Sequence, residues 1–228
     1  MLYEVEVINN KKESPSAYTL ILSKPQGFTF LPGQFVHLQT TIDDKPIRRS
    51  YSIASAPHQK HIHISIRIQE HGRVSPVLAQ IPVGSQLKMI GPFGLFTRTQ
   101  ETHSLFIAAG TGVTPFISYL QEAKHQQDIR KATLLYSNKT QQDMLYHTQL
   151  QELAANNWFS YYPTLTQEQW DNNNGRISKE DIKKHLTKDT VIYLCGSNAF
   201  VRAMNQLLIE LNVSVENIRT ENYGNITS

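Results

Sequence analysis

The first hundred residues alternate between apolar and polar positions in short runs separated by turn residues such as Leu31-Pro32-Gly33 and Val83-Gly84. A period of two places every second side chain on one face of a strand, so each run predicts a β-strand with one buried face. Several short strands with regular turn signals are typical of an antiparallel barrel or sandwich. The predicted strands cover residues 3–8, 17–22, 35–38, 47–55, 62–68 and 86–90.

The pattern changes near residue 100. The run from Leu105 to Ala109 is apolar without alternation, which predicts a strand buried on both faces. It leads through a glycine-rich turn into a segment that begins near Pro115 and has apolar residues at helical spacing. Ser178 and Asp181 have the spacing of a capping box. Further strands are predicted at 132–137 and 191–195, and further helices at 144–155 and 199–211.

This alternation of strands and helices predicts a doubly wound parallel sheet whose ligand lies beyond the carboxyl ends of the strands. We therefore expect an α/β nucleotide-binding domain after an antiparallel β-barrel. The change of pattern places the boundary between residues 97 and 101, so the two predicted domains are 1–99 and 100–228.

Composition narrows the function classes. The chain has 228 residues, 39% hydrophobic and 18% charged, and a net charge of +3 that is dispersed along the sequence, so we expect neither nucleic acid nor a membrane surface as a partner. Its one cysteine, Cys195, excludes an internal disulfide and a self-contained four-cysteine iron–sulfur cluster. No apolar stretch approaches the ~20 residues of a membrane span, and we expect a cytoplasmic monomer. His61 and His63 share a strand face without a third ligand nearby, so no metal site is expected.

Three short motifs have residue types suited to a nucleotide cofactor. In Arg49-Ser50-Tyr51-Ser52, Arg49 and Tyr51 project from one face of a strand, where a guanidinium matches a phosphate and a ring can lie on a flat heterocycle. Gly110-Thr111-Gly112 and Gly72-Arg73-Val74-Ser75 each join a glycine turn to a helix start, whose free backbone amides attract phosphate. Taken singly, each motif is equally explained as an ordinary strand, turn or capped helix.

The order of the motifs resembles the ferredoxin-NADP+ reductase family of flavoproteins over essentially the whole chain. The matching segments are Arg49-Ser50-Tyr51-Ser52 for RxYS, Gly72-Arg73-Val74-Ser75 for GxxS, Gly91-Pro92-Phe93-Gly94 for GPxG, Gly110-Thr111-Gly112-Val113-Thr114-Pro115 for GTGxxP, and Cys195-Gly196 at the end of a late strand. The resemblance implies an FAD-binding barrel followed by a pyridine-nucleotide domain, with hydride passing between NAD(P)H and FAD.

The resemblance also implies residue roles. Tyr51 would stack on the flavin ring, Ser52 would hydrogen-bond near its N5 atom, and Cys195 would pack the nicotinamide into place, although a buried strand equally explains Cys195 as a small core residue. Arg49 would pair with a flavin phosphate. The other cofactor-binding residues implied are Ser50, Ile66, Arg67, Gly72, Val74 and Ser75 for the flavin and Gly110, Thr111, Gly112, Thr114, Pro115 and Gly196 for the nicotinamide nucleotide.

The sequence leaves two alternatives each for the nucleotide preference and for the role of Tyr223. The adenosine ribose is expected to be read at Ser137, Asn138 and Lys139, after the predicted strand residues Leu134-Leu135-Tyr136, and at Arg176. These residues suit either a 2′-phosphate or a bare diol, with NADH favoured. Tyr223 either covers the flavin or belongs to a surface tail.

The resulting expectation is a flavoprotein oxidoreductase that passes electrons from NAD(P)H through FAD to a separate acceptor: ferredoxin, flavodoxin, an oxygenase component or free flavin. The alternatives are an NAD(P)H:flavin reductase that uses flavin as a substrate, and a nucleotide-binding regulatory subunit without turnover. Intact flavin and nicotinamide motifs favour the enzyme.

Overall fold

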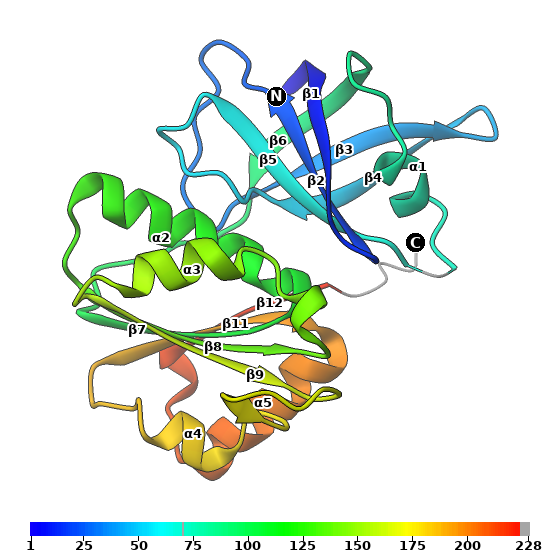
Figure 1. Ribbon diagram of the computed structural model, residues 1–228. Coiled ribbons are helices and arrows are strands. Elements are labelled where there is room, and N and C mark those ends of the chain that lie inside the picture. Colours follow the sequence, from blue (N-terminus) through cyan, green and yellow to red (C-terminus); the bar gives the residue numbers. More distant parts are fainter. Residues whose placement is uncertain (70, 224–228) are drawn as a thin grey trace. The chain divides into compact units, whose positions relative to one another are not determined.

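A computed structural model describes residues 1–69 and 71–223 (Figure 1). The chain forms two compact units. The first unit contains Met1–Thr97 together with Thr114–Gln126, and the second contains Arg98–Val113 together with the chain from Gln127 onward. Each unit is described separately below.

The first unit contains a six-stranded antiparallel sheet with the strand order β4-β3-β6-β1-β2-β5. Its two edge strands meet where Ile53 bridges Ile64 and the Ala54 amide donates to the His63 carbonyl over 2.9 Å, so the sheet closes into the predicted barrel. The strands are β1 (Leu2–Ser14), β2 (Ala17–Ser23), β3 (Phe35–Ile42), β4 (Lys45–Ser52), β5 (His61–Arg67) and β6 (Gln86–Phe93).

The barrel interior is filled by the alternate apolar residues that the sequence pattern predicted, among them Val5, Leu20, Val36, Ile64 and Met89, each fully buried. Two helices belong to this unit, α1 (Ser75–Ala79) and α2 (Thr114–Gln126). The Ser118 hydroxyl of α2 donates to the Ser55 carbonyl over 2.7 Å, and the Tyr119 hydroxyl donates to the Phe96 carbonyl over 2.8 Å. These buried hydrogen bonds fix α2 to the barrel loops.

The second unit contains a six-stranded sheet with the order β10-β9-β8-β7-β11-β12, and every neighbouring pair is parallel. The predicted doubly wound sheet is therefore confirmed, and its order reverses between β7 and β11. The strands are β7 (His103–Ala109), β8 (Lys131–Asn138), β9 (Phe159–Leu165), β10 (Asn173–Asn174), β11 (Thr190–Ser197) and β12 (Ile218–Tyr223); the 3-10 turns are η1 (Gly110–Val113), η2 (Gln141–Asp143) and η3 (Val215–Asn217).

Three α-helices cover this sheet. Figure 1 shows α4 (Lys179–Lys183) and α5 (Asn198–Glu210) on one face and α3 (His147–Ala154) on the other. Ile182, Met204 and Leu208 pack on the strand residues Leu105 and Ile192. The predicted capping box is confirmed, because the Ser178 hydroxyl accepts from the Asp181 amide over 3.2 Å and the Asp181 carboxylate from the Ser178 amide over 3.0 Å.

The structure corrects two expectations about local structure. The helix predicted over 144–155 begins only at His147, since Tyr146 has a φ of 60° that an α-helix cannot contain. Strands β9 and β12 were not predicted. In β9, Phe159 is buried and Tyr162 is 39% exposed.

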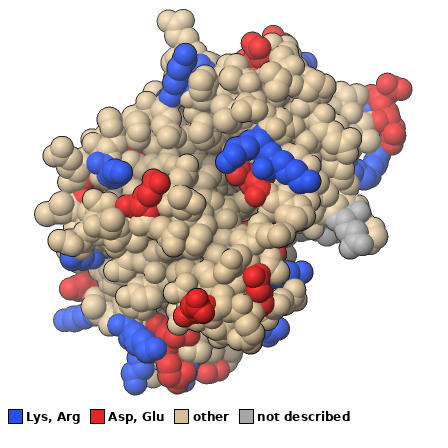
Figure 2. All heavy atoms as spheres, in the orientation of Figure 1, with Lys and Arg blue, Asp and Glu red and all other residues tan. Residues whose placement is uncertain are grey.

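Figure 2 shows lysine and arginine side chains interspersed with acidic ones over the visible face. Within residues 1–69 and 71–223, no helix is both long enough and apolar enough to cross a membrane.

Candidate functional site

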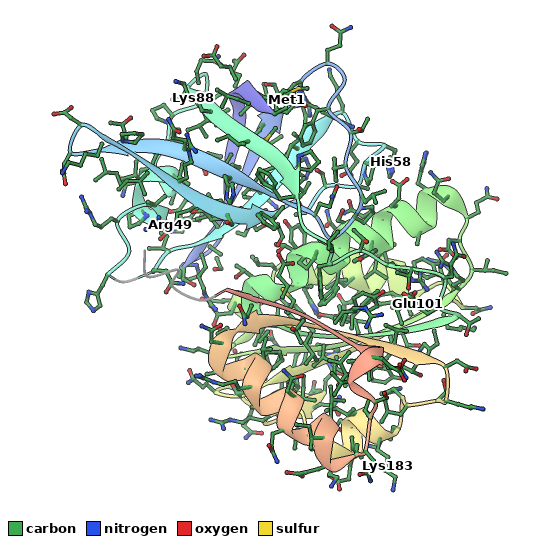
Figure 3. The ribbon with its side chains drawn as sticks, turned by 180° about the vertical axis from the view of Figure 1, so that it is seen from behind. Met1, Arg49, His58, Lys88, Glu101 and Lys183 are labelled. Atoms are coloured by element: carbon green, nitrogen blue, oxygen red, sulfur yellow. The ribbon has the colours of Figure 1, made fainter. Side chains whose placement is uncertain are left out.

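Strand β4 presents Arg49 and Tyr51 on one face, as predicted. In the register of β3 and β4, Arg49 pairs with Leu38 and Tyr51 with Val36, and directly paired residues share a face of the sheet. Arg49 is exposed and donates to the Arg48 carbonyl over 2.8 Å; Figure 3 labels it on the barrel. Tyr51 is half-buried against the barrel core, and burial raises the pKa of its phenol to about 12 despite the opposing effect of Arg49. A cation and a neutral ring therefore stand side by side on an edge strand.

The two serines of this motif leave β4 on the opposite face. Ser50 pairs with His37 in the register, and its hydroxyl lies 3.0 Å from His37 Nδ1. The His37 ring packs against Phe93 with ring centres 4.9 Å apart, and burial, together with the charge of Arg48, lowers the pKa of this histidine. Ser52 is 4% exposed. A ligand on the Arg49 face would therefore meet the backbone of Ser50 rather than its hydroxyl.

The glycine turn before α1 is folded tightly on itself. The Gly72 amide donates to the Gln69 carbonyl over 2.9 Å, and the Gln69 amide donates to the Ser75 hydroxyl over 3.0 Å. A Cβ atom at Gly72 would lie 2.8 Å from Gln69 Cβ, so the turn requires glycine. Val74 is buried and precedes α1, and Ser75 is the first residue of that helix.

Strand β5 contains Ile66 and Arg67, which the resemblance assigned to the flavin, and it offers a ligand mainly its backbone. Ile66 is fully buried in the barrel core, so its side chain cannot face a ligand. Arg67 is half-buried, and its guanidinium lies 3.4 Å from the Ser16 hydroxyl. Arg67 is therefore the residue of this pair whose side chain reaches the surface.

The second candidate region lies where β7 and β11 end. Gly110 has a φ of 54°, and its carbonyl accepts from the Tyr136 hydroxyl over 3.0 Å. A Cβ atom at Gly112 would overlap the Cys195 carbonyl oxygen, so only glycine allows this close approach of η1 to β11. Thr111 is half-buried, and Thr114 and Pro115 are buried at the start of α2. Since the strand order reverses between β7 and β11, this is the position at which open α/β sheets bind ligands.

Cys195 is fully buried, and in the sheet register it pairs with Ala108 on one side and Glu221 on the other. The next residue, Gly196, is confined by the Phe200 ring, which a Cβ atom would approach to 2.8 Å. Both residues therefore shape the carboxyl end of β11 by packing.

Glu221, which pairs with Cys195 in the register of β11 and β12, is a buried polar residue near this region that the sequence pattern did not reveal. Its Oε2 atom is buried without a hydrogen-bond partner among the described residues, and burial raises the pKa of its carboxyl group to about 7. Its one signal in the sequence was its place two positions before Tyr223. Tyr223 ends β12, and its side chain lies outside the described part of the chain.

The end of β8 contains a second unsatisfied group. Asn138 is 5% exposed, and within the described residues neither its side-chain oxygen nor its nitrogen has a hydrogen-bond partner. A buried amide without partners is costly, and a polar ligand would satisfy it. Ser137 is half-buried, whereas Lys139 and Arg176 are exposed. The residues at this edge of the sheet thus fit the polar parts of a nucleotide.

The described residues contain no group of three or more His, Cys, Asp or Glu side chains placed to hold a metal ion.

Comparison with known proteins also divides the chain near residue 100, although α2, which the structure groups with the first unit, falls within the second match. Residues 4–97 match the oxidoreductase FAD-binding domain, and residues 106–206 match the oxidoreductase NAD-binding domain. NADH-cytochrome b5 reductase 1 of Lodderomyces elongisporus is 32% identical over 206 residues, which cover 85% of this chain and 69% of the relative. Ferredoxin-NADP reductase B of Sorangium cellulosum is 27% identical over 237 residues, 97% of each chain.

Other relatives are longer. Flavohemoprotein A of Dictyostelium discoideum is 27% identical over 97% of this chain, and the chain spans only 60% of that protein's length. Among solved structures, a ferredoxin NADP+ reductase from Neisseria gonorrhoeae with bound FAD and NADP superposes with a TM-score of 0.88 at 21% identity, covering 97% of this chain and 98% of the other. This last likeness concerns the fold.

Proposed function

The chain belongs to the ferredoxin-NADP+ reductase-like family of FAD- and NAD-binding oxidoreductases, and from this premise we propose that it oxidises NAD(P)H with FAD and delivers the electrons to a separate acceptor. The observation that supports the proposal is the presence of two half-sites in one chain. One is the β4 face with Arg49 and Tyr51, and the other is the glycine turn at the strand-order reversal. A protein that only binds one nucleotide would need only one of them.

On the flavin side, the Arg49 guanidinium would neutralise a phosphate of FAD, because it is exposed and matches phosphate geometry. The Tyr51 ring would lie on the flavin, and its raised pKa of about 12 keeps the phenol neutral at working pH. The turn from Gly72 to Ser75 would hold the pyrophosphate with backbone amides, and Ser52 with the backbone of Ile66 and Arg67 would border the ring. Bound FAD would supply the two-electron acceptor for the hydride of NAD(P)H.

On the nicotinamide side, the Gly110–Gly112 turn would hold the nucleotide with backbone amides, with Thr114 and Pro115 fixing the start of the following helix. Cys195 and Gly196 would pack the nicotinamide. The adenosine half would meet the residues after β8, and the unsatisfied Asn138 amide supports this placement. Hydride transfer needs no side-chain acid or base, so these residues contribute orientation and the exclusion of water.

The remaining assignments belong to the same proposal. Residues 1–99 would form the FAD-binding domain and 100–228 the NAD(P)-binding domain, which the matches over 4–97 and 106–206 support. The acceptor would be a carrier protein such as ferredoxin, flavodoxin, an oxygenase component or, by analogy with the cytochrome b5 reductases, a haem protein. The single cysteine is buried in β11, which suits the reducing cytoplasm in which we place a monomer.

An anaerobic visible spectrum of the purified protein tests the proposal. We expect flavin absorbance that bleaches on addition of a reduced nicotinamide nucleotide and returns when an oxidised carrier protein is added. Turnover with free FAD or FMN alone, but not with any carrier protein, would instead identify a flavin reductase. A colourless protein that gains neither absorbance nor turnover from added FAD or FMN would refute the reductase and leave a nucleotide-binding subunit.

A further inference from the structure

The loops that follow β8 and β9 are joined to each other. These neighbouring strands lie side by side in Figure 1, and their pairing continues past their ends. The Thr166 amide donates to the Asn138 carbonyl over 2.9 Å, and the Gln167 amide donates to the Lys139 carbonyl over 3.0 Å. The segment 166–168 therefore forms one wall of the place where the loop 138–141 leaves the sheet.

Glu168 closes this arrangement with a charged contact. Its carboxylate accepts from the backbone amide of Gln141 over 2.8 Å, at the first residue of η2. A second carboxylate, that of Asp143, accepts from the Thr140 hydroxyl over 3.1 Å. The chain thus places two carboxylates at the loop after β8, Asp143 from that loop and Glu168 from the loop after β9, and the Glu168 carboxylate occupies a backbone amide that could otherwise bind an anion.

The loop after β8 lies where the adenosine ribose of a nucleotide is expected, so the two carboxylates at this loop bear on which nucleotide binds. In a doubly wound sheet, the residues after the second strand of the nucleotide-binding unit face the ribose of the adenosine half, and β8 is that strand here. A 2′-phosphate at this ribose carries up to two negative charges and requires N–H donors and cations. Two exposed cations, Lys139 and Arg176, lie at this edge of the sheet, but the carboxylates of Glu168 and Asp143 equal them in number and hold the Gln141 amide and the Thr140 hydroxyl as donors.

The buried amide of Asn138 also favours a nucleotide with a free ribose diol over one with a 2′-phosphate. Its unpaired oxygen and nitrogen offer one neutral acceptor and a neutral donor in the strand end that this loop continues. Hydroxyl groups both donate and accept hydrogen bonds, so a ribose diol can satisfy such an amide as well as a carboxylate. A phosphate dianion has no proton to give to either acceptor.

Resting on the proposed function, we infer that the chain is specific for NADH and that Glu168 is a specificity-determining residue, which rejects the 2′-phosphate of NADPH. The repulsion comes from a side chain of the neighbouring loop rather than from the loop after β8 itself.

Two variants separate charge from structure. Glu168→Gln removes the charge and keeps an oxygen that can accept from the Gln141 amide, whereas Glu168→Lys reverses the charge and loses that acceptor. Glu152→Gln, which removes an exposed carboxylate from α3, is the matched control. For each protein, kcat/KM is measured with NADH and with NADPH at low and high salt.

We expect the ratio of kcat/KM for NADPH to that for NADH to rise about tenfold in Glu168→Gln and further in Glu168→Lys, mainly through the KM for NADPH, and the gain to shrink at high salt. The control should keep the wild-type ratio. A wild-type preference for NADPH, or a ratio that does not rise with either variant, would overturn the inference.

Calorimetry with adenosine 2′,5′-bisphosphate and adenosine 5′-phosphate gives a readout that needs no turnover. The wild type should bind the bisphosphate no more tightly than the monophosphate, and Glu168→Lys should reverse that order. If this pattern appears in a protein that oxidises neither dinucleotide, the proposed function fails while the specificity assignment stands. If neither fragment binds any of the proteins, the adenosine site is wrong and the inference falls with it.

Discussion

The second unit should lose stability as the pH rises through the range from 4.5 to 7, and Glu221 is the cause. Its carboxyl group is half-buried in β12, its Oε2 atom has no hydrogen-bond partner among the described residues, and burial raises its pKa from 4.5 to about 7. Ionisation in the folded state is therefore disfavoured, whereas the unfolded chain ionises freely.

The sign and size of the effect follow from linkage. Between pH 4.5 and 7 the folded state holds a proton that the unfolded state has released, so each increase in pH favours unfolding. The stabilising contribution is complete below pH 4.5 and is lost as the pH passes through 7. A pKa difference of about 2.5 corresponds to about 3 kcal/mol, which is an upper value because the residue is only half-buried.

Glu221→Gln removes the titration and keeps the shape of the side chain. Relative to the wild type, we expect the free energy of unfolding of this variant to increase by up to about 3 kcal/mol between pH 4.5 and 8. Both tryptophans, Trp158 and Trp170, belong to the second unit, so tryptophan fluorescence during urea unfolding at saturating FAD reports on the correct part of the chain.

Glu152→Gln serves as the control, because it deletes an exposed carboxylate of the same unit and should show no pH-dependent difference from the wild type. If the difference between Glu221→Gln and the wild type is constant from pH 4.5 to 8, then the Glu221 carboxyl ionises normally in the folded protein. In that case the reasoning from burial is refuted.

Three further substitutions test the packing and the half-sites. Arg49→Ala should raise the dissociation constant of FAD about tenfold in fluorescence titrations. The control is Arg48→Ala, which removes a guanidinium from the other face of β4, where it donates to Gln39 of β3, and should leave that constant unchanged. Equal effects of the two substitutions would remove Arg49 from the phosphate site. Gly112→Ala should slow flavin reduction by NADH about tenfold in stopped-flow traces while the FAD content is retained, because the new methyl group displaces the turn from β11. An unchanged rate would contradict the placement of the nicotinamide nucleotide at this turn. Glu101→Ala removes the carboxylate that lies 3.4 Å from Arg98 and accepts from the Tyr193 hydroxyl over 2.8 Å. Because Asp128 remains 3.5 Å from Arg98, we expect a loss of about 2 kcal/mol in urea unfolding; a loss near zero would mean that the Glu101 contacts contribute little.

The parts of the structure that the sequence predicted are those whose cause is local. The alternation in the first hundred residues predicted the barrel, and the apolar run before Gly110 predicted the central strand and its turn. The capping box of Ser178 needs only three residues of separation. In each case the residues that determine the structure are neighbours in the chain, so their pattern is visible without any knowledge of the fold.

The parts that were missed depend on partners from elsewhere in the chain. Strand β12 is mostly polar, and it is a strand because β11 offers a backbone partner for six of its residues. The Asn138 and Glu221 side chains stand out only because the folded sheet buries them. The contact of Glu168 with Gln141 spans 27 residues and arises only once β8 and β9 are paired.

The two halves of the proposed nucleotide site are built from different parts of the chain. The turn that would hold the nicotinamide half is confined by backbone contacts between η1 and the end of β11, where a single added methyl group at Gly112 is excluded. The residues that would meet the adenosine half lie at the ends of β8 and β9 and in the loops that follow them. A change of charge at Glu168 would therefore alter nucleotide preference without moving the backbone that would hold the nicotinamide. On this proposal, a match to the glycine turn alone does not identify whether NADH or NADPH is used.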